Sequence, residues 1–227
     1  TIRVRTPHGR DDLLLLTHEM IDYGAGLPIR LIIQKIGSVN KHWHQSMELL
    51  MVLTGEVTVT VEDNCYELKE DDLILINCNQ IHETNSESAI LALLQIRLSM
   101  LKSSGISSNV SFICNSATTS DKERFYNIKT IMARLIMLTS DSQEKASPNL
   151  LIMAYTHMLL HELTTHFSVP ADKVISHSDE NLDRLSKITN YIEAHYMEEV
   201  SLDRVAREVH LNSAYLSHFF RKNMGMS

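Results

Sequence analysis

The hydrophobic residues of this 227-residue chain change their spacing at about residue 116, and this change constrains the fold more than any other feature. Before it, apolar residues occur in short runs and alternations, which are typical of β-strands. After it, they recur every three or four residues, which is the spacing of one helix face. We therefore expect an α+β chain, in which an all-β part is followed by an all-helical part.

The strand signals before residue 116 are short and are separated by polar turns. The segment Glu56–Glu62 alternates strictly, and Asp63 and Asn64 behind it supply a turn, so a half-buried strand should enter a hairpin there. With no helical segment expected between the strands, the pattern predicts an antiparallel sandwich or small barrel. The expected strands lie within Leu13–Leu16, Ile29–Ile36, Glu48–Leu53, Val57–Val61, Leu73–Ile76, Ile90–Ile96 and Val110–Ile113.

Two strong helix patterns follow, one over Phe125–Leu138 and one that starts at Ser147, where a capping serine precedes proline, and runs to about His166. Two adjacent apolar helices should pack as a hairpin, which we expect to carry dimer contacts. The stretch Ser168–Asn181 has no apolar period and is the best linker candidate. We therefore divide the chain into residues 1–115, 116–178 and 179–227.

Composition and charge narrow the class of protein. With 44% hydrophobic and 22% charged residues, the chain should be an ordinary globular protein, and no apolar stretch approaches the roughly 18 residues of a membrane-spanning helix. Three widely spaced cysteines favour a reducing cytoplasm and exclude a thiolate metal cluster. The net charge of −7 argues against nucleic-acid binding, but residues 201–227 hold four Lys and Arg against two Asp and Glu. Residues 201–227 are therefore mildly basic, although the chain as a whole is acidic.

The last 27 residues contain two short helix patterns at helix-turn-helix spacing. Ser201 should cap the first, and the small Ala206 lets a second helix, from Asn212 to about Asn223, cross it closely. The expected inward residues are Leu202, Val205, Ala206 and Val209 in the first helix, and Leu216, Phe219 and Phe220 in the second. The opposite face carries short and basic groups that can reach base edges in a major groove, namely Ser213, Ala214, Ser217, His218 and Arg221. The residues placed to meet phosphates are Arg204, Arg207 and Lys222.

This segment resembles the first helix-turn-helix of the arabinose-regulator (AraC-type) transcription factors. The resemblance lies in Ser201-Leu202 with Val205-Ala206, in the run Leu211–Lys222 and in Gly225-Met226-Ser227. It implies sequence-specific DNA binding by a homodimer, controlled by a small molecule, commonly a sugar or related metabolite. In that family a connecting helix and a second helix-turn-helix follow, whereas this sequence stops at Ser227, so we expect poor operator affinity from the half unit.

A set of histidines and one carboxylate lies in the strand region. His42, His44 and Glu48 have even numbers, so on one extended strand their side chains leave the same face, and His82 follows about 34 residues after Glu48. Together with Gly55, this spacing resembles the two-part cupin signature, which implies a jelly-roll barrel with these four residues at its site. The sequence departs from the signature in two places. Gly37 stands one residue too close to His42, and the usual Pro and Gly of the second part are Asn77 and Asn79.

The four side chains admit two interpretations. Three imidazoles and a carboxylate suit Zn, Mn, Fe or Ni, with coordination positions left open. They also suit a polar effector pocket without metal, which we favour because sensor cupins joined to helix-turn-helix units often lack one. Our first hypothesis is thus a ligand-responsive DNA-binding transcription regulator and not an enzyme. The alternative is a metal-dependent cupin enzyme, an isomerase or oxygenase, with a structural helical tail.

Overall fold

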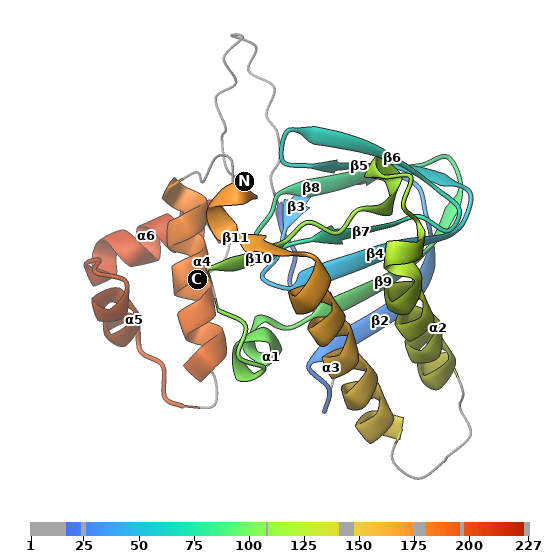
Figure 1. The fold of residues 1–227 in the computed structure, drawn as a ribbon. Helices are drawn as coiled ribbons and strands as arrows, with labels where there is room; N and C mark the ends of the chain where they lie inside the picture. The colour runs from blue at the N-terminus through green and yellow to red at the C-terminus, as the bar shows by residue number, and fades with distance from the viewer. Residues whose placement is uncertain are drawn as a thin grey trace, which may run out of the picture.

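The computed structural model describes residues 17–23, 26–107, 109–140, 148–174, 180–195 and 198–224. Two sheets face each other as a sandwich and helices follow, so the expected α+β class is confirmed (Figure 1). The first sheet has the order β1 (Thr17–His18), β3 (Val39–Trp43), β8 (His82–Asn85), β5 (Glu56–Val61) and β6 (Asn64–Lys69). The second has the order β2 (Ile29–Ile36), β9 (Ala89–Ile96), β4 (Met47–Thr54) and β7 (Leu73–Ile76). All pairs are antiparallel except β1 with β3.

The longer expected strands are confirmed, and the β5–β6 turn falls at Glu62, whose φ is +53°. The expected strand at Leu13–Leu16 lies outside the described residues. The expectation of no helix among the strands is wrong, because Leu98–Ser103 forms a helix, α1, between β9 and β10 (Val110–Phe112). Six residues are too few for a helical period to show, and Met100 and Leu101 hold this turn against the core.

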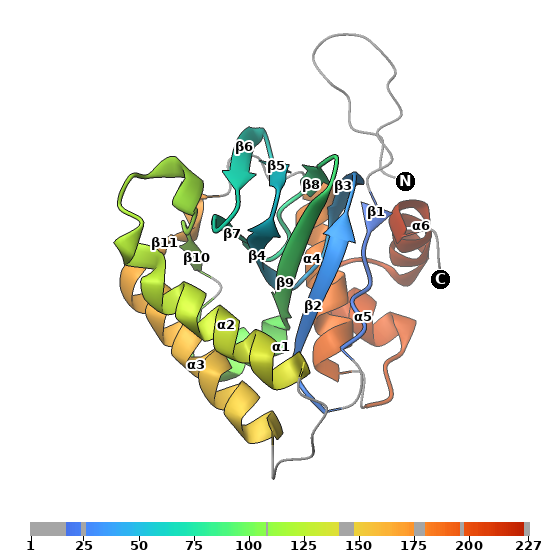
Figure 2. The ribbon, with the colours of Figure 1, turned by 90° about the vertical axis from the view of Figure 1, so that its right-hand side faces the viewer.

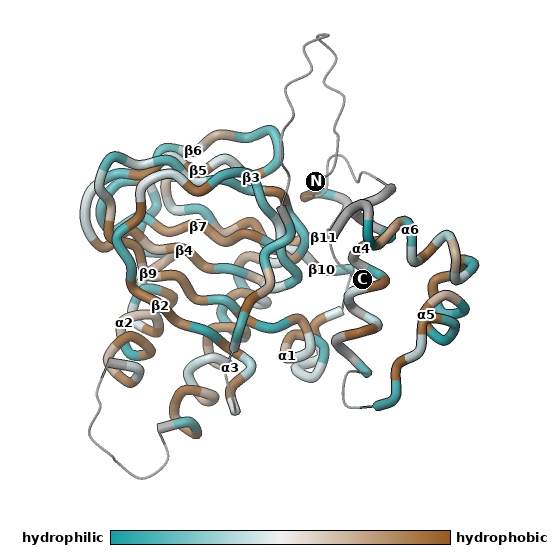
Figure 3. Tube along the Cα trace, turned by 180° about the vertical axis from the view of Figure 1, so that it is seen from behind, coloured by the Kyte–Doolittle hydropathy of each residue, from teal (hydrophilic) through white to brown (hydrophobic). Residues whose placement is uncertain are grey.

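Strands β4, β7 and β9 of the second sheet are largely buried on both faces, which explains why they are continuously apolar instead of alternating (Figure 3). Leu50 in β4 and Leu91 in β9 face the first sheet, whereas Leu49 and Leu94 face the helices. The first sheet has solvent on its outer face, and β5 accordingly alternates exposed or half-buried residues with buried ones. The spacing of apolar residues along a strand therefore indicates whether one or both faces of its sheet are buried.

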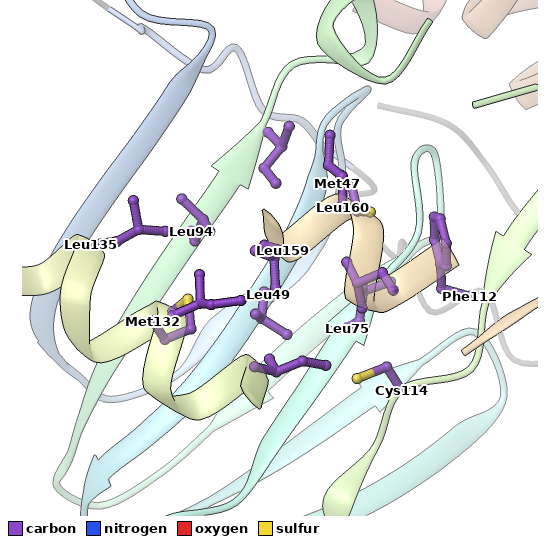
Figure 4. Packing of buried hydrophobic residues seen from close by; sticks show 14 of the residues in the cluster. Met47, Leu49, Leu75, Leu94, Phe112, Cys114, Met132, Leu135, Leu159 and Leu160 are labelled. Carbon is purple, nitrogen blue, oxygen red and sulfur yellow. The ribbon is translucent and has the colours of Figure 1, made fainter. Parts of the chain in front are cut away.

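The helical hairpin covers the outer face of the second sheet (Figures 1 and 2). It consists of α2 (Tyr126–Ser140) and α3 (Pro148–His166), as the spacing predicts. Met132 and Leu135 of α2 and Leu159 of α3 pack on the sheet in one hydrophobic cluster (Figure 4). The start of the expected linker is instead a strand, β11 (Ser168–Pro170), which pairs with β10. Short 3-10 helices of one turn each lie at Ser116–Thr118 (η1), Glu123–Phe125 (η2) and Ala171–Lys173 (η3).

Three further helices form a separate hydrophobic cluster beside the β1–β3 side of the sandwich (Figures 1 and 2). They are α4 (Glu180–His195), α5 (Leu202–Glu208) and α6 (Ser213–Met224). The Ser201 side chain caps α5 by accepting from the Arg204 amide, as expected. Leu202 was expected to face inward but is 48% exposed, because it lies one turn before the residues of α5 that meet α6. Among the described residues, none of the helices is both long and apolar enough to cross a bilayer.

Candidate functional site

Three histidines from two paired strands converge inside the sandwich. His42 lies on β3 opposite His82 at the start of β8, and His44 follows just after β3. The ring centroids of His42 and His82 are 4.1 Å apart, and those of His44 and His82 are 4.9 Å apart. One ring nitrogen of each histidine lies within 4.8 Å of the other two. The structure thus brings together the three histidines that the sequence singled out.

A backbone carbonyl orients each of the three rings. Because a carbonyl oxygen can only accept, each Nδ1 must carry the hydrogen, and in the neutral ring Nε2 then carries the lone pair. The three Nε2 atoms are therefore the ones available to a ligand, a proton or a metal ion. The accepting oxygens belong to Asn40 for His42 (2.9 Å), Ser46 for His44 (3.1 Å) and Gln80 for His82 (3.0 Å).

Glu48 joins this cluster from β4 and is buried. Its Oε2 lies 3.1 Å from His44 Nε2 and accepts a hydrogen bond of 2.7 Å from Gln95 Nε2. Burial alone would raise the pKa of Glu48, but the hydrogen bond with His44, the charges of His82 and His44, and the Gln95 amide lower it to about 2. The two facing atoms, Glu48 Oε2 and His44 Nε2, are joined by a shared hydrogen or by a metal ion.

His82 leaves one polar atom unused. Its Nε2 is buried and has no hydrogen-bond partner among the described residues. Burial is the main reason that the pKa of His82 falls to about 4, so the ring is neutral at pH 7 and its Nε2 presents a lone pair to the cavity. An unpaired buried acceptor of this kind is costly unless something binds it. The donor set of three imidazole nitrogens with a nearby carboxylate therefore fits a transition-metal ion, and it also fits a ligand that donates a hydrogen bond.

Sequence reasoning missed three polar residues that complete the pocket. Glu19 Oε2 lies 3.5 Å from His42 Nε2, and Gln95 donates to Glu48. Arg30 donates to the Gln95 side-chain carbonyl at 3.1 Å. Arg30 and Gln95 are polar positions on the inward face of otherwise apolar strands, which is a signal that the sequence does offer. The segment around Glu19 carries no such signal.

Trp43 points the opposite way from the two histidines that flank it in sequence. It is 1% exposed and belongs to the hydrophobic cluster of α4, α5 and α6, in which it meets residues such as Leu185, Ala206 and Phe219. Trp43 is therefore a core residue, and its core is that of the helical unit. The His18 ring stands edge-on to it, with the two centroids 4.4 Å apart.

The residues of α6 that were expected to face the core or the DNA lie largely as expected. Leu216 and Phe219 are buried, while Ala214, His218 and Arg221 are exposed on the other side. Ser217 is half-buried, and so is Ser213, whose hydroxyl is hydrogen-bonded to the Asp203 carboxylate. Of the phosphate candidates, Arg207 is exposed and Arg204 forms an ion pair of 2.7 Å with Glu198. The side chain of Lys222 lies outside the described residues.

Comparisons with known proteins find distant relatives among HTH-type transcriptional regulators. An uncharacterized HTH-type transcriptional regulator of Staphylococcus aureus is 22% identical over 179 residues, which are 77% of this chain and 23% of that protein. A counterpart from strain COL is 23% identical over 186 residues, which are 80% of this chain and 24% of the relative. The chain thus spans about a quarter of the length of these curated relatives.

Among solved structures, ToxT from Vibrio cholerae superposes with a TM-score of 0.46 and 11% identity, covering 88% of this chain and 78% of ToxT. A cupin superfamily protein from Desulfitobacterium hafniense gives a TM-score of 0.31 at 15% identity, covering 33% of this chain and 72% of that one. Residues 30–96 match the family described as the cupin domain. The chain therefore contains a cupin domain and is distantly related to HTH-type transcriptional regulators.

Proposed function

We propose that the chain is a ligand-responsive, DNA-binding transcription regulator of the cytoplasm. The observation that carries this proposal is that one short segment contributes side chains to two different regions. His42 and His44 belong to the histidine cluster, whereas Trp43 between them is buried in the helix-turn-helix cluster. In this proposal residues 1–115 sense a small polar effector, such as a sugar or related metabolite, residues 116–178 contact a second copy, and residues 179–227 bind DNA.

The coupling follows from the alternation of side chains along an extended chain. A ligand that changes the positions of His42 and His44 displaces the backbone that also holds Trp43. It shifts the helical unit only to the extent that it binds one arrangement more tightly than the other. A typical coupling of about 1 to 3 kcal/mol changes DNA affinity roughly 5- to 150-fold.

A double-mutant comparison of amide hydrogen exchange tests this coupling without knowledge of the effector. We expect His82→Ala to change the protection of amides in α4–α6, and we expect that change to disappear when Trp43→Leu is also present. Leu68→Ala is the matched control, because Leu68 is fully buried in the sandwich cluster that does not include Trp43. Identical protection of α4–α6 in wild type and in His82→Ala contradicts the proposal.

DNA binding is assigned to the exposed face of α6. Arg221 and His218 are placed to contact base edges, and the exposed Arg207 is placed to contact a phosphate. Selecting the duplexes that the wild type binds from a pool of random sequence gives its preferred sequence. The affinity and base preference of each variant are then compared with those of the wild type. Arg221→Ala should relax the preference at one base position and cost about 1 to 3 kcal/mol, whereas Arg207→Ala should weaken binding to all sequences. Lys35→Ala, an exposed position on β2, is the control, and unchanged specificity in Arg221→Ala and in His218→Ala would refute the assignment.

Self-association is supported by the outer surface of the hairpin. Exposed large hydrophobic side chains there suit a contact with a second copy of the chain, which would let two weak half-site contacts add. Sedimentation velocity should show a dimer that charged substitutions on this surface dissociate. The residues concerned, each more than half exposed, are Tyr126, Met137, Leu150, Leu151 and Met158.

The unpaired His82 Nε2 also favours a second candidate function, that of a metal-dependent cupin enzyme. His42, His44 and His82, with Glu48 beside them, would hold the ion, which would supply Lewis-acid chemistry to a bound substrate. Metal analysis of protein purified without added metal tests this candidate. One equivalent of a transition metal, lost in His82→Ala, supports it, and a clean absence of metal removes it.

A further inference from the structure

A row of polar side chains crosses the inner face of the second sheet at the histidine cluster. The strand register places Arg30 opposite Gln95, and Gln95 opposite Glu48. The Gln95 amide bridges the two, because its carbonyl accepts from Arg30 at 3.1 Å and its nitrogen donates to Glu48 at 2.7 Å. Gln95 thereby fixes both charged groups on the wall of the same cavity, which His82 also lines.

Arg30 lines this cavity and has donors to spare. Within the described part of the chain, its side chain donates to the neutral Gln95, and no carboxylate lies within ion-pair distance. A guanidinium offers five N–H donors in a planar fork that matches the two oxygens of a carboxylate. A pocket arginine held in place by a neutral amide is therefore suited to an anion that comes from outside the chain.

The remaining wall of the cavity sets the size and character of the ligand. The cavity volume is about 120 Å³, well below the roughly 300 to 1,000 Å³ of pockets that hold drug-sized ligands, so the ligand should be small. The next row of the sheet is aliphatic and consists of Ile32, Leu93 and Leu50. At the other end, the buried Nε2 of His82 is an acceptor without a donor.

These features together define a ligand, and the inference rests on the proposed sensor function. We infer that the pocket binds a short 2-hydroxycarboxylate, whose carboxylate is held by Arg30 and whose hydroxyl donates to His82 Nε2. The alkyl end lies against the aliphatic row.

The experiment uses lactate as the probe and lactamide as its uncharged match, measured by isothermal titration calorimetry on the full chain with and without added Zn²⁺. Lactate should bind saturably, and lactamide about tenfold more weakly or worse. Arg30→Gln should weaken lactate binding about tenfold or more, and Arg30→Lys should weaken it less. Lys35→Gln is the matched control, because Lys35 is exposed on the same strand and its substitution removes the same charge. It should bind lactate as the wild type does.

The inference is overturned if lactate does not bind in either metal condition, if lactamide binds equally well, or if the Arg30 and Lys35 variants respond alike. Arg30→Lys provides the comparison if Arg30→Gln does not fold. Amide exchange in α4–α6 is followed in the same samples and separates this inference from the proposed function. If lactate does not bind but His82→Ala still changes amide exchange in α4–α6, only the proposed ligand class is wrong. If lactate binds through Arg30 without any change in α4–α6 or in DNA affinity, the sensor function falls and the site stands.

Discussion

Glu48→Gln should remove a defined part of the acid sensitivity of folding. The pKa of Glu48 is about 2 in the folded protein, against an ordinary value of 4.5. At about 1.4 kcal/mol for each pKa unit, this difference contributes about 3 kcal/mol to the free energy of unfolding. Because the folded-state pKa is the lower one, the contribution is complete above pH 4.5 and is lost as the pH falls toward 2. About 2 kcal/mol of it should disappear between pH 5 and pH 3.

Urea unfolding of wild type and variant at pH 5 and pH 3 measures this loss. The wild type should lose about 2 kcal/mol more than Glu48→Gln across this interval. The variant should still fold, since a glutamine at this position can accept from Gln95 and donate to the lone pair of His44. Glu67→Gln, at an exposed position on β6, is the control and should keep the wild-type slope. Equal slopes in wild type and Glu48→Gln would show that the pocket does not hold this carboxylate in its charged form.

Two backbone features give further predictions. Gly55 has a φ of +86°, and a Cβ added there would lie 2.7 Å from the Ser88 carbonyl oxygen, so Gly55→Ala should lower the free energy of unfolding by about 2 kcal/mol or more in urea. Gly26→Ala, with a φ of +116° but open space around the new Cβ, should cost less, and equal costs would contradict the steric argument. Ser201→Ala removes the cap of α5 and should cost about 1 kcal/mol, seen as faster amide exchange in α5 but not in β4; unchanged exchange in α5 would refute this.

The sequence predicts the apolar strands of the second sheet and misses β3 and β8, which carry His42 and His82 of the site. The strict alternation of β5 and the apolar run of β4 report one and two buried faces. By contrast, the inward-facing residues of β3 and β8 include His42 and His82. Because these residues are polar, the apolar alternation from which a strand is predicted does not appear there. The expectation that His42, His44 and Glu48 share one extended strand is wrong, because β3 ends at Trp43 and Glu48 lies on β4, and the fold still brings the three side chains together.

The rest of the site depends on register, which a single sequence does not specify. Arg30, Gln95 and Glu48 are far apart along the chain and become neighbours only because three strands pair with those residues opposite one another. Asn79, which stands where the cupin signature has glycine, adopts a φ of +65°. Asparagine tolerates that left-handed conformation better than most residues, so this departure from the signature leaves the turn intact.

The magnitudes also favour Trp43 as the point of coupling. Removing a buried tryptophan typically costs about 3 to 5 kcal/mol, whereas regulation requires a coupling of about 1 to 3 kcal/mol. A ligand therefore need not expel Trp43 from its cluster, because the loss of a fraction of its contacts is enough. Close packing makes such a loss possible from a small displacement, since a gap of 0.5 to 1 Å already forfeits roughly a quarter to a half of a dispersion contact. In the proposed regulator, a shift of that size in His42 and His44 on ligand binding is sufficient to bias α4, α5 and α6.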